Sequence, residues 1–470
     1  MSPPLTSETP AVPKKRWLGG LVFAILLVVA VLILVSSLAL SGSGSGDGEL
    51  AGVAYCRAGD TFVRLSYLAD YASDSDPLRR RLLEQSADYY TFAQESDPHT
   101  LGYSLSLALT LDAMGERNSA ARTLSQALFR AGARERVQFR PVLLVLTSES
   151  LRPEWVESAR GRIRGVGPGP LLLADAYRRM GEPDLAEQER RKMAEQSLSL
   201  VPGLLTMLAI CGFVLAWGVV GLGWAGIYLV RRWWRHSPGA EPALPPLWST
   251  RVLAEALVAC VLLQAVVGGI VALLLWYSPL MEVIMIAAAT VVSGGGALIW
   301  VKLRPPRGAA FGWVFPRFWR QLSAGLVAAG VAVIPFLLLA QLVGRFSGGR
   351  PLDDPLMGMI VSMFQRAPAG LVAVMICLVV PPLEETLFRG VLFRGLRSRR
   401  SFWWAAAVSA LIFAALHGSA VSALPLFLLG VLFAYLCEKH HSLLAPTVAH
   451  AAYNAFNLAI LMFVYGSGTP

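Results

Sequence analysis

Apolar residues are distributed along this chain in long runs that predict a membrane protein. Each run carries few charges and is separated from the next by a polar segment. A helix needs about 20 mostly apolar residues to cross a bilayer. Nine runs meet or approach this length, at 17–40, 201–230, 252–276, 280–301, 321–344, 369–393, 402–418, 423–437 and 443–464. We therefore expect an all-α, polytopic transmembrane helical bundle of about nine spans.

The first apolar run reads as a retained anchor. Lys14, Lys15 and Arg16 precede it, and the run 17–40 is longer than the apolar core of a signal peptide, about 7–15 residues. We expect residues 1–16 to lie in the cytoplasm.

Composition and charge agree with this topology. Hydrophobic residues make up 55% of the chain, charged residues only 15%, and the mean hydropathy is +0.54, which excludes an ordinary soluble enzyme. Basic residues gather in the segments predicted to be cytoplasmic, 231–251, 302–320, 394–400 and 438–442. This bias orients a multi-pass protein in the plasma membrane with 41–199 outside the cytoplasm. It also accounts for the net charge of +10, so we expect the lipid bilayer and no nucleic acid as a partner.

The polar stretch 41–199 reads as an extracytoplasmic helical domain. Leu105–Leu128 resembles Leu171–Ala194, since in both an apolar helix ends at Met-Gly-Glu and an Ala-containing helix follows. Met114 and Met180 are 66 residues apart, about twice the tetratricopeptide period of 34. A tetratricopeptide-type array that docks a protein partner and a plain helical bundle both fit this pattern. After this domain we expect transmembrane spans and cytoplasmic loops at 200–319.

Ionisable side chains in the last spans are the candidate chemistry. Charged groups in the hydrocarbon core are costly, so they mark functional sites. The apolar helices of the segment 320–465 hold six such polar groups: Glu384, Glu385, Arg389, His417, His450 and Asn454.

The spacing of these groups predicts how they act together. Glu385 and Arg389 are four residues apart and share a helix face, so they can form an ion pair. Glu384 lies about 100° round the same helix and points elsewhere. His450 and Asn454 are also four apart, and His417 arrives from a third helix.

A set of this kind can hydrolyse a peptide bond with water. Glu384 suits a general base, and His417 can share the proton of the water or hold its position. The tetrahedral oxyanion needs hydrogen-bond donors, which His450 and Asn454 can supply. We expect these four side chains to converge at a site that water can reach.

Three motifs resemble one known family. Glu-Glu-x-x-x-Arg, Phe-x-x-x-His and His-x-x-x-Asn, in this order on successive apolar helices, resemble the CPBP family of intramembrane proteases, which includes CAAX prenyl endopeptidases and bacteriocin-processing proteins. The resemblance covers residues 320–465. It implies an intramembrane endopeptidase acting on a membrane-protein or lipidated peptide substrate. By position it implies that Glu384 and His417 activate water, that His450 and Asn454 stabilise the oxyanion, and that Glu385 and Arg389 support them.

Two alternatives remain open. Glu384, His417 and His450 are ligand types that zinc accepts, although the sequence contains no His-Glu-x-x-His, and we favour a mechanism without a cofactor. The second alternative is a non-catalytic membrane scaffold or immunity-type protein that binds a partner through residues 41–199.

Overall fold

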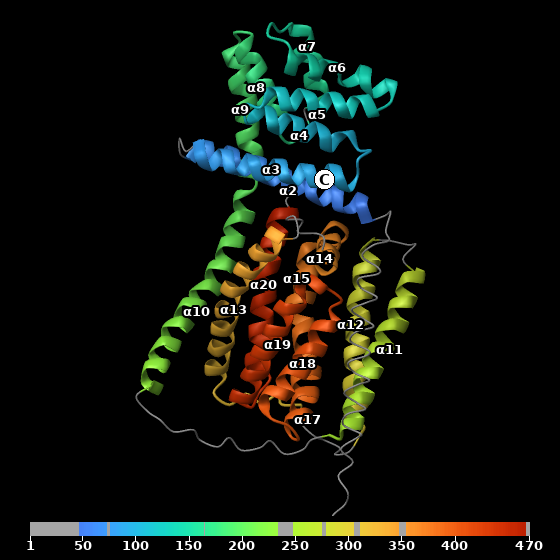
Figure 1. The fold of residues 1–470 in the computed structure, drawn as a ribbon, viewed down its shortest axis with the longest axis vertical. Coiled ribbons are helices and arrows are strands. Elements are labelled where there is room, and N and C mark those ends of the chain that lie inside the picture. Colours follow the sequence, from blue (N-terminus) through green and yellow to red (C-terminus); the bar gives the residue numbers. More distant parts are fainter. Residues whose placement is uncertain are drawn as a thin grey trace, which may run out of the picture.

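The computed structural model describes residues 47–72, 76–163, 165–233, 248–274, 279–304, 311–346 and 354–466. The predicted anchor at 17–40 lies outside these residues. The described residues form helices, turns and bends without a strand, which confirms the all-α fold. An outer domain of helices stands on one end of a bundle of apolar helices (Figure 1).

Every predicted span from residue 201 onward coincides with helical structure. The bundle consists of α10 Val201–Trp233, α11 Thr250–Leu274, α12 Pro279–Lys302, α13 Phe318–Phe346, α14 Pro355–Arg366, α15 Ala369–Val374, η2 Met375–Val379, α16 Val380–Glu385, η3 Thr386–Phe393, α17 Arg394–Arg397, α18 Phe402–Leu416, α19 Ala420–His440 and α20 Leu444–Gly466. Within the described residues, four helices are long and apolar enough to cross a membrane: Pro183–Gly223, Ala369–Arg397, Ser422–His440 and Leu444–Tyr465. The chain is thus an integral membrane protein, and the count of nine spans stays a prediction.

The outer domain is built from helices that pack in sequence order. They are α2 Asp47–Ala72, α3 Asp76–Ser96, α4 Leu101–Ala113, α5 Arg117–Arg130, α6 Ala133–Thr147, α7 Pro153–Ile163, α8 Gly169–Arg179 and α9 Pro183–Leu198. Leu105, Leu124, Val145 and Leu173 belong to one buried core that joins α4 through α8.

The two Met-Gly-Glu turns have the same geometry. Gly115 and Gly181 both adopt positive φ, 85° and 82°, a conformation that favours glycine after a helix. The next residue, Glu116 in one turn and Glu182 in the other, donates its backbone N–H back across the turn at 2.9 Å. The pair α6–α7 lies between α4–α5 and α8–α9 in the chain, and it packs on both, through α5 and α8, while α4 also contacts α8 directly. Pro141 lies inside α6, and no Met-Gly-Glu follows it, so the sequence hides this middle pair. The tetratricopeptide-type assignment stays a prediction.

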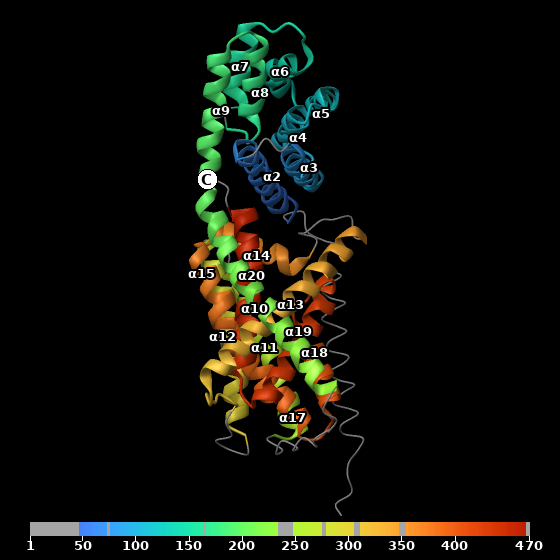
Figure 2. The ribbon, with the colours of Figure 1, turned by 90° about the vertical axis from the view of Figure 1, so that its left-hand side faces the viewer.

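The outer domain is seated on the bundle through α2 and α3 (Figure 2). The hydroxyl of Thr61 in α2 lies 3.1 Å from the backbone carbonyl of Val464, in the last turn of α20, and 3.0 Å from the Arg57 carbonyl of its own helix, so its one hydrogen is shared between the two acceptors. The last four carbonyls of a helix lack an intrahelical donor, so Thr61 satisfies one of them. Tyr89 of α3 contacts Tyr465 edge to face, with ring centroids 6.3 Å apart. The outer domain therefore caps a helix of the bundle directly.

Small residues allow the bundle helices to approach closely. A Cβ added at Gly330 of α13 would lie 2.2 Å from the backbone nitrogen of Gly218 in α10. A Cβ at Gly325 would lie 2.7 Å from the backbone oxygen of Ala445 in α20. Such contacts are typical of membrane helices, where association depends on close backbone packing.

Candidate active site

The helical segment 369–397, which carries Glu384, is not a continuous α-helix. Two π-helical stretches, η2 and η3, lie on either side of α16. In a π-helix the N–H of residue i+5 bonds to the carbonyl of residue i. Residue 381 would therefore donate to Ile376, but it is a proline and has no N–H. Asn454 of α20 donates its side-chain amide to the Ile376 carbonyl instead, at 2.9 Å.

Glu385 and Arg389 form the ion pair that their spacing predicts. Both side chains are 0% exposed, and Arg389 Nη1 donates to Glu385 Oε1 at 3.0 Å. Arg389 Nη2 donates to the backbone carbonyl of Gly430 at 3.2 Å. The guanidinium also lies over the rings of Phe413 and Phe433, with centroids 4.5 Å and 5.1 Å away. A buried charge needs such compensation on several sides.

His450 is held in one orientation by this pair. Its Nδ1 lies 3.0 Å from Glu385 Oε1, the same oxygen that accepts from Arg389. A carboxylate only accepts hydrogen bonds, so Nδ1 carries the proton and Nε2 is left to face the site. The imidazole stacks on Phe433, with centroids 5.1 Å apart and 23° between the rings. Its Nε2 lies 3.8 Å from Glu384 Oε2.

His417 is held in the same tautomer by a different acceptor. It follows the last residue of α18, where its backbone N–H bonds to Ala414, one residue nearer than in an α-helix. The carbonyl of Phe413 instead lies 2.7 Å from His417 Nδ1, which must therefore carry the proton. His417 Nε2 lies 4.0 Å from Glu384 Oε2.

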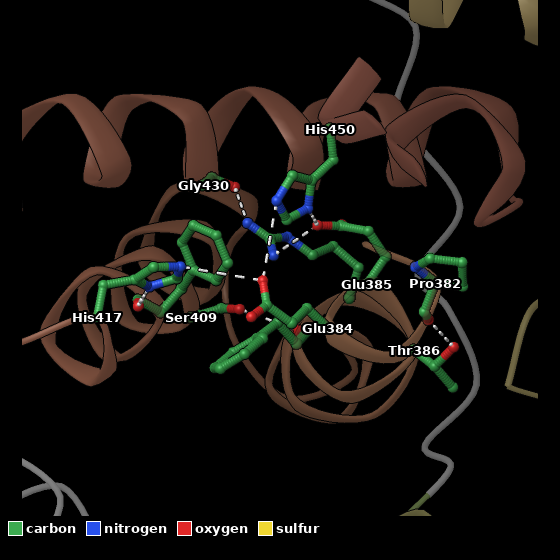
Figure 3. A network of polar contacts seen from close by, with 11 residues as sticks. Pro382, Glu384, Glu385, Thr386, Ser409, His417, Gly430 and His450 are labelled. Carbon is green, nitrogen blue, oxygen red and sulfur yellow. Dashed lines mark hydrogen bonds and ion pairs between the residues drawn. The ribbon is translucent and has the colours of Figure 1, made fainter. Parts of the chain in front are cut away.

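These contacts converge on one carboxylate oxygen (Figure 3). Glu384 is 22% exposed, and its Oε2 is buried with no hydrogen-bond partner among the described residues. A water that bonds to two atoms at about 2.8 Å can bridge any separation below about 5.6 Å. Both imidazole nitrogens are nearer than that to Glu384 Oε2. One water can therefore touch the carboxylate and an imidazole.

The structure thus brings five of the six predicted residues into one network. Glu384, His417 and His450 face one another, and Glu385 with Arg389 lies behind His450. The sixth, Asn454, directs its amide nitrogen to the Ile376 carbonyl. That amide has a second hydrogen, which this bond does not use.

Sequence reasoning missed several residues that support the cluster. Phe433 stacks on His450, but its position in an apolar run gave no signal. Trp313 Nε1 donates to Thr386 Oγ1 at 3.0 Å, next to the Glu-Glu pair. Asp354 caps α14 and accepts a hydrogen bond from Ser422, close to the turn that follows His417. The only sequence signal for these residues was an aspartate placed directly before an apolar stretch.

The donor set was also tested for a metal. Within the described ranges, no group of three or more His, Cys, Asp or Glu side chains is arranged to hold a metal ion. Two imidazole nitrogens, from His417 and His450, nevertheless lie within 4.0 Å of the carboxylate oxygen Oε2 of Glu384. Each imidazole has its other nitrogen on an acceptor, as in zinc sites. In donor type the three residues fit zinc.

The sequence of the segment that carries this site was compared with families of known proteins, and it is similar to one of them. Residues 366–456 match a family model described as "Type II CAAX prenyl endopeptidase Rce1-like". The matched segment contains all six of the predicted site residues. The segment is therefore similar in sequence to a family of membrane proteases.

One curated relative supports the same class. A protein of Bacillus subtilis (strain 168) named "Putative membrane peptidase YdiL" is 30% identical over 97 residues, which are 21% of this chain and 39% of the relative. The chain thus spans about four tenths of the length of that relative. No solved structure matches the chain significantly. The resemblance to the CPBP family of intramembrane proteases is confirmed.

Proposed function

We propose that the protein is an intramembrane endopeptidase that cleaves a membrane-associated or lipidated substrate with a water activated by Glu384 and His417. One observation carries the proposal. An unpartnered oxygen of Glu384 faces the free Nε2 atoms of two imidazoles inside an apolar bundle. Buried polar atoms without partners mark places where ordered water binds.

The proposed reaction moves one proton through this cluster. Glu384 removes a proton from the water, and the water oxygen forms a bond to the carbonyl carbon of the substrate. The carbonyl electron pair moves onto its oxygen. When the tetrahedral intermediate collapses, the C–N bond breaks and the proton passes to the leaving nitrogen. His417 Nε2 orients the water, because its lone pair can accept the second O–H.

His450 and Asn454 supply the donors for the oxyanion in this proposal. Since Nδ1 of His450 donates to Glu385, its Nε2 can donate only when the ring is an imidazolium. The second amide hydrogen of Asn454 is the other donor. Preorganised donors of this kind are worth about 10²–10³ in rate.

Zinc is the runner-up mechanism, because the three side chains are of types that zinc accepts as ligands. Glu384, His417 and His450 would hold the ion, which would supply a Lewis acid and a more acidic water. Activity that survives exhaustive chelation supports the metal-free proposal. Activity that is lost on chelation and restored by zinc would replace it.

The decisive experiment compares two isosteric variants. Glu384→Gln keeps the size of the side chain and removes the base. Glu255→Gln is a matched control on α11, where the carboxylate pairs with Arg251 on the surface of the bundle. We expect an uncut membrane-protein precursor to accumulate in cells with Glu384→Gln and not with Glu255→Gln. Unchanged processing with Glu384→Gln would favour the non-catalytic scaffold.

The wider setting is proposed from the same topology. We place the N-terminus in the cytoplasm, the protein in the plasma membrane and the outer domain outside the cytoplasm. Whether the substrate carries a prenyl group depends on the cell that makes it, so the proposal covers membrane proteins and lipidated peptides alike. The outer domain is proposed to bind a protein partner.

A further inference from the structure

An exposed basic tip lies where α5 joins α6 in the outer domain, far in sequence from the site. We define the basic tip by six exposed residues: Phe129, Arg130, Arg134, Arg136, Val137 and Arg140. Phe129 is 82% exposed and Val137 is 75% exposed. They are the two most exposed large apolar side chains among the described residues of the outer domain. Nothing in the fold explains why they face solvent.

The basic tip is charged in a domain that is otherwise balanced. Residues 47–198 contain 20 Lys and Arg against 22 Asp and Glu. Residues 130–140 contain four Arg against one Glu. That glutamate, Glu135, accepts a hydrogen bond from the backbone N–H of Gly132 at 2.7 Å, so it is tied to the start of α6. The positive charge of the tip is therefore concentrated and largely uncompensated.

The four arginines of the tip lack the ion pairs that several other arginines of the domain form. Arg117 pairs with Asp112 and Asp175, and Arg160 pairs with Glu189. No arginine of the tip pairs with an acidic side chain in the described part of the chain. Arginine beside an exposed aromatic ring is the composition of binding hot spots.

The backbone of the tip is fixed before any partner arrives. Leu128 is buried in the outer core directly before Phe129, and Phe139 packs against the same core. Glu135 closes the first turn of α6 onto Gly132. A preorganised surface loses little entropy when it binds.

We propose that the basic tip binds an acidic segment of an extracytoplasmic protein or protein domain. Carboxylates of that segment pair with Arg134, Arg136 and their neighbours, in the bidentate geometry that arginine favours. An apolar side chain of the segment covers Phe129. Both views place α6 at the end of the outer domain that points away from the bundle (Figures 1 and 2). A membrane surface under the domain cannot reach it, which favours a protein over a lipid headgroup.

This surface gives the proposed protease a basis for choosing substrates. The outer domain is seated on α20, the helix of His450, through Thr61 and Tyr89. A membrane protein held by its acidic outer segment would stay beside the bundle while its membrane segment enters the site. This step, and the placement of the partner outside the cytoplasm, rest on the proposed function. Binding of an acidic peptide by the tip does not.

The test measures binding without cleavage. The full chain with Glu384→Gln is placed in nanodiscs of zwitterionic lipid, and fluorescence anisotropy follows a labelled 12-residue peptide of alternating Glu and Leu. We expect Arg134→Glu/Arg136→Glu to weaken binding at least 10-fold and Phe129→Ala about 5-fold. The matched control, Arg79→Glu/Arg81→Glu on α3, should change it less than 2-fold. Thermal unfolding of each variant shows whether the domain stays folded, and Arg134→Ala/Arg136→Ala repeats the test without added charge.

Clear outcomes would overturn the inference. Equal binding of the peptide and its Lys-for-Glu counterpart, or equal binding by Arg134→Glu/Arg136→Glu and the parent, would remove the basic tip as a site. Binding only to vesicles of anionic lipid would assign it to a membrane instead. If the tip binds as expected, grafting the acidic segment onto a substrate of the active protein should raise its cleavage several-fold. Tip binding without that gain would leave a docking site for a partner that is not cleaved.

Discussion

The buried Glu385–Arg389 pair offers the sharpest test of the site. Arg389→Met keeps an unbranched apolar stem, removes the guanidinium and its charge, and leaves the Glu385 carboxylate with His450 as its remaining partner. Both members of the pair are 0% exposed, so solvent cannot screen the loss. Glu385→Gln makes the converse change and leaves Arg389 unpaired. The double variant removes both charges together.

The structure sets the expected size of these effects. Removing one partner of a buried ion pair costs about 3–5 kcal/mol, because the other charge stays buried. A neutral hydrogen bond in a membrane protein is worth only about 0.6 kcal/mol on average. We therefore expect each single variant to lose about 3 kcal/mol or more. The double variant should lose less than the sum of the two, by about 2–3 kcal/mol.

Equilibrium unfolding in mixed micelles measures these free energies. Ser409→Ala is the control, because Ser409 Oγ donates a buried neutral hydrogen bond to the Phe388 carbonyl in the same helices, at 3.0 Å. We expect it to cost about 1 kcal/mol. If Arg389→Met costs no more than Ser409→Ala, or if the two single costs simply add, the pair is not held as charges and our reading of the site fails.

Three further predictions test other parts of the molecule. Asn454→Ala should lower the free energy of unfolding by about 1–3 kcal/mol in the same micelles, because the Ile376 carbonyl loses its donor in an apolar bundle. An unchanged free energy would contradict the explanation that Asn454 replaces the N–H that Pro381 lacks. Thr61→Val should cost about 1 kcal/mol and increase hydrogen exchange at the end of α20, since the Val464 carbonyl loses its cap. Burial raises the pKa of Asp60 above its ordinary 3.8, so ionisation of Asp60 lowers the stability of the folded domain as the pH rises from 3.8 through the folded-state pKa. Asp60→Asn should therefore stabilise the outer domain at pH 7. The gain in thermal unfolding temperature should shrink as the pH approaches 3.8.

The sequence predicts the bundle well because lipid enforces a simple rule. A helix that faces hydrocarbon must be apolar over most of its length, so the long helices of the bundle stand out as apolar runs. Helix α14 was missed for the same reason. It is a 12-residue amphipathic helix within a loop that holds arginines and aspartates, and neither length nor polarity marks it as a span.

The residues of the site were predictable because charge is rare in apolar runs, but their contacts were not. The spacing of Glu385 and Arg389 gives their pairing directly. The contact between His450 and Glu385, 65 residues away, depends on how two helices meet. The 3.6-residue period of a helix gives the face on which a side chain lies, but not how deep in the membrane it lies. Glu384 is the sixteenth residue of the helical segment that begins at Ala369, and His450 is the seventh of α20, so residue counts alone place them at different levels. Glu384 Oε2 and His450 Nε2 are nevertheless 3.8 Å apart.

Pro381 and Pro382 explain part of that difference. An α-helix with two prolines in its middle loses two backbone donors, a local rule that proteins break mainly at functional sites. Here the break converts the flanking turns into π-helix, which changes the direction of every side chain that follows. It also exposes the Ile376 carbonyl, which recruits Asn454 and so ties α20 beside Glu384. The same defect that costs the helix its regular bonding therefore aligns the helix of His450 with the carboxylate that it must serve.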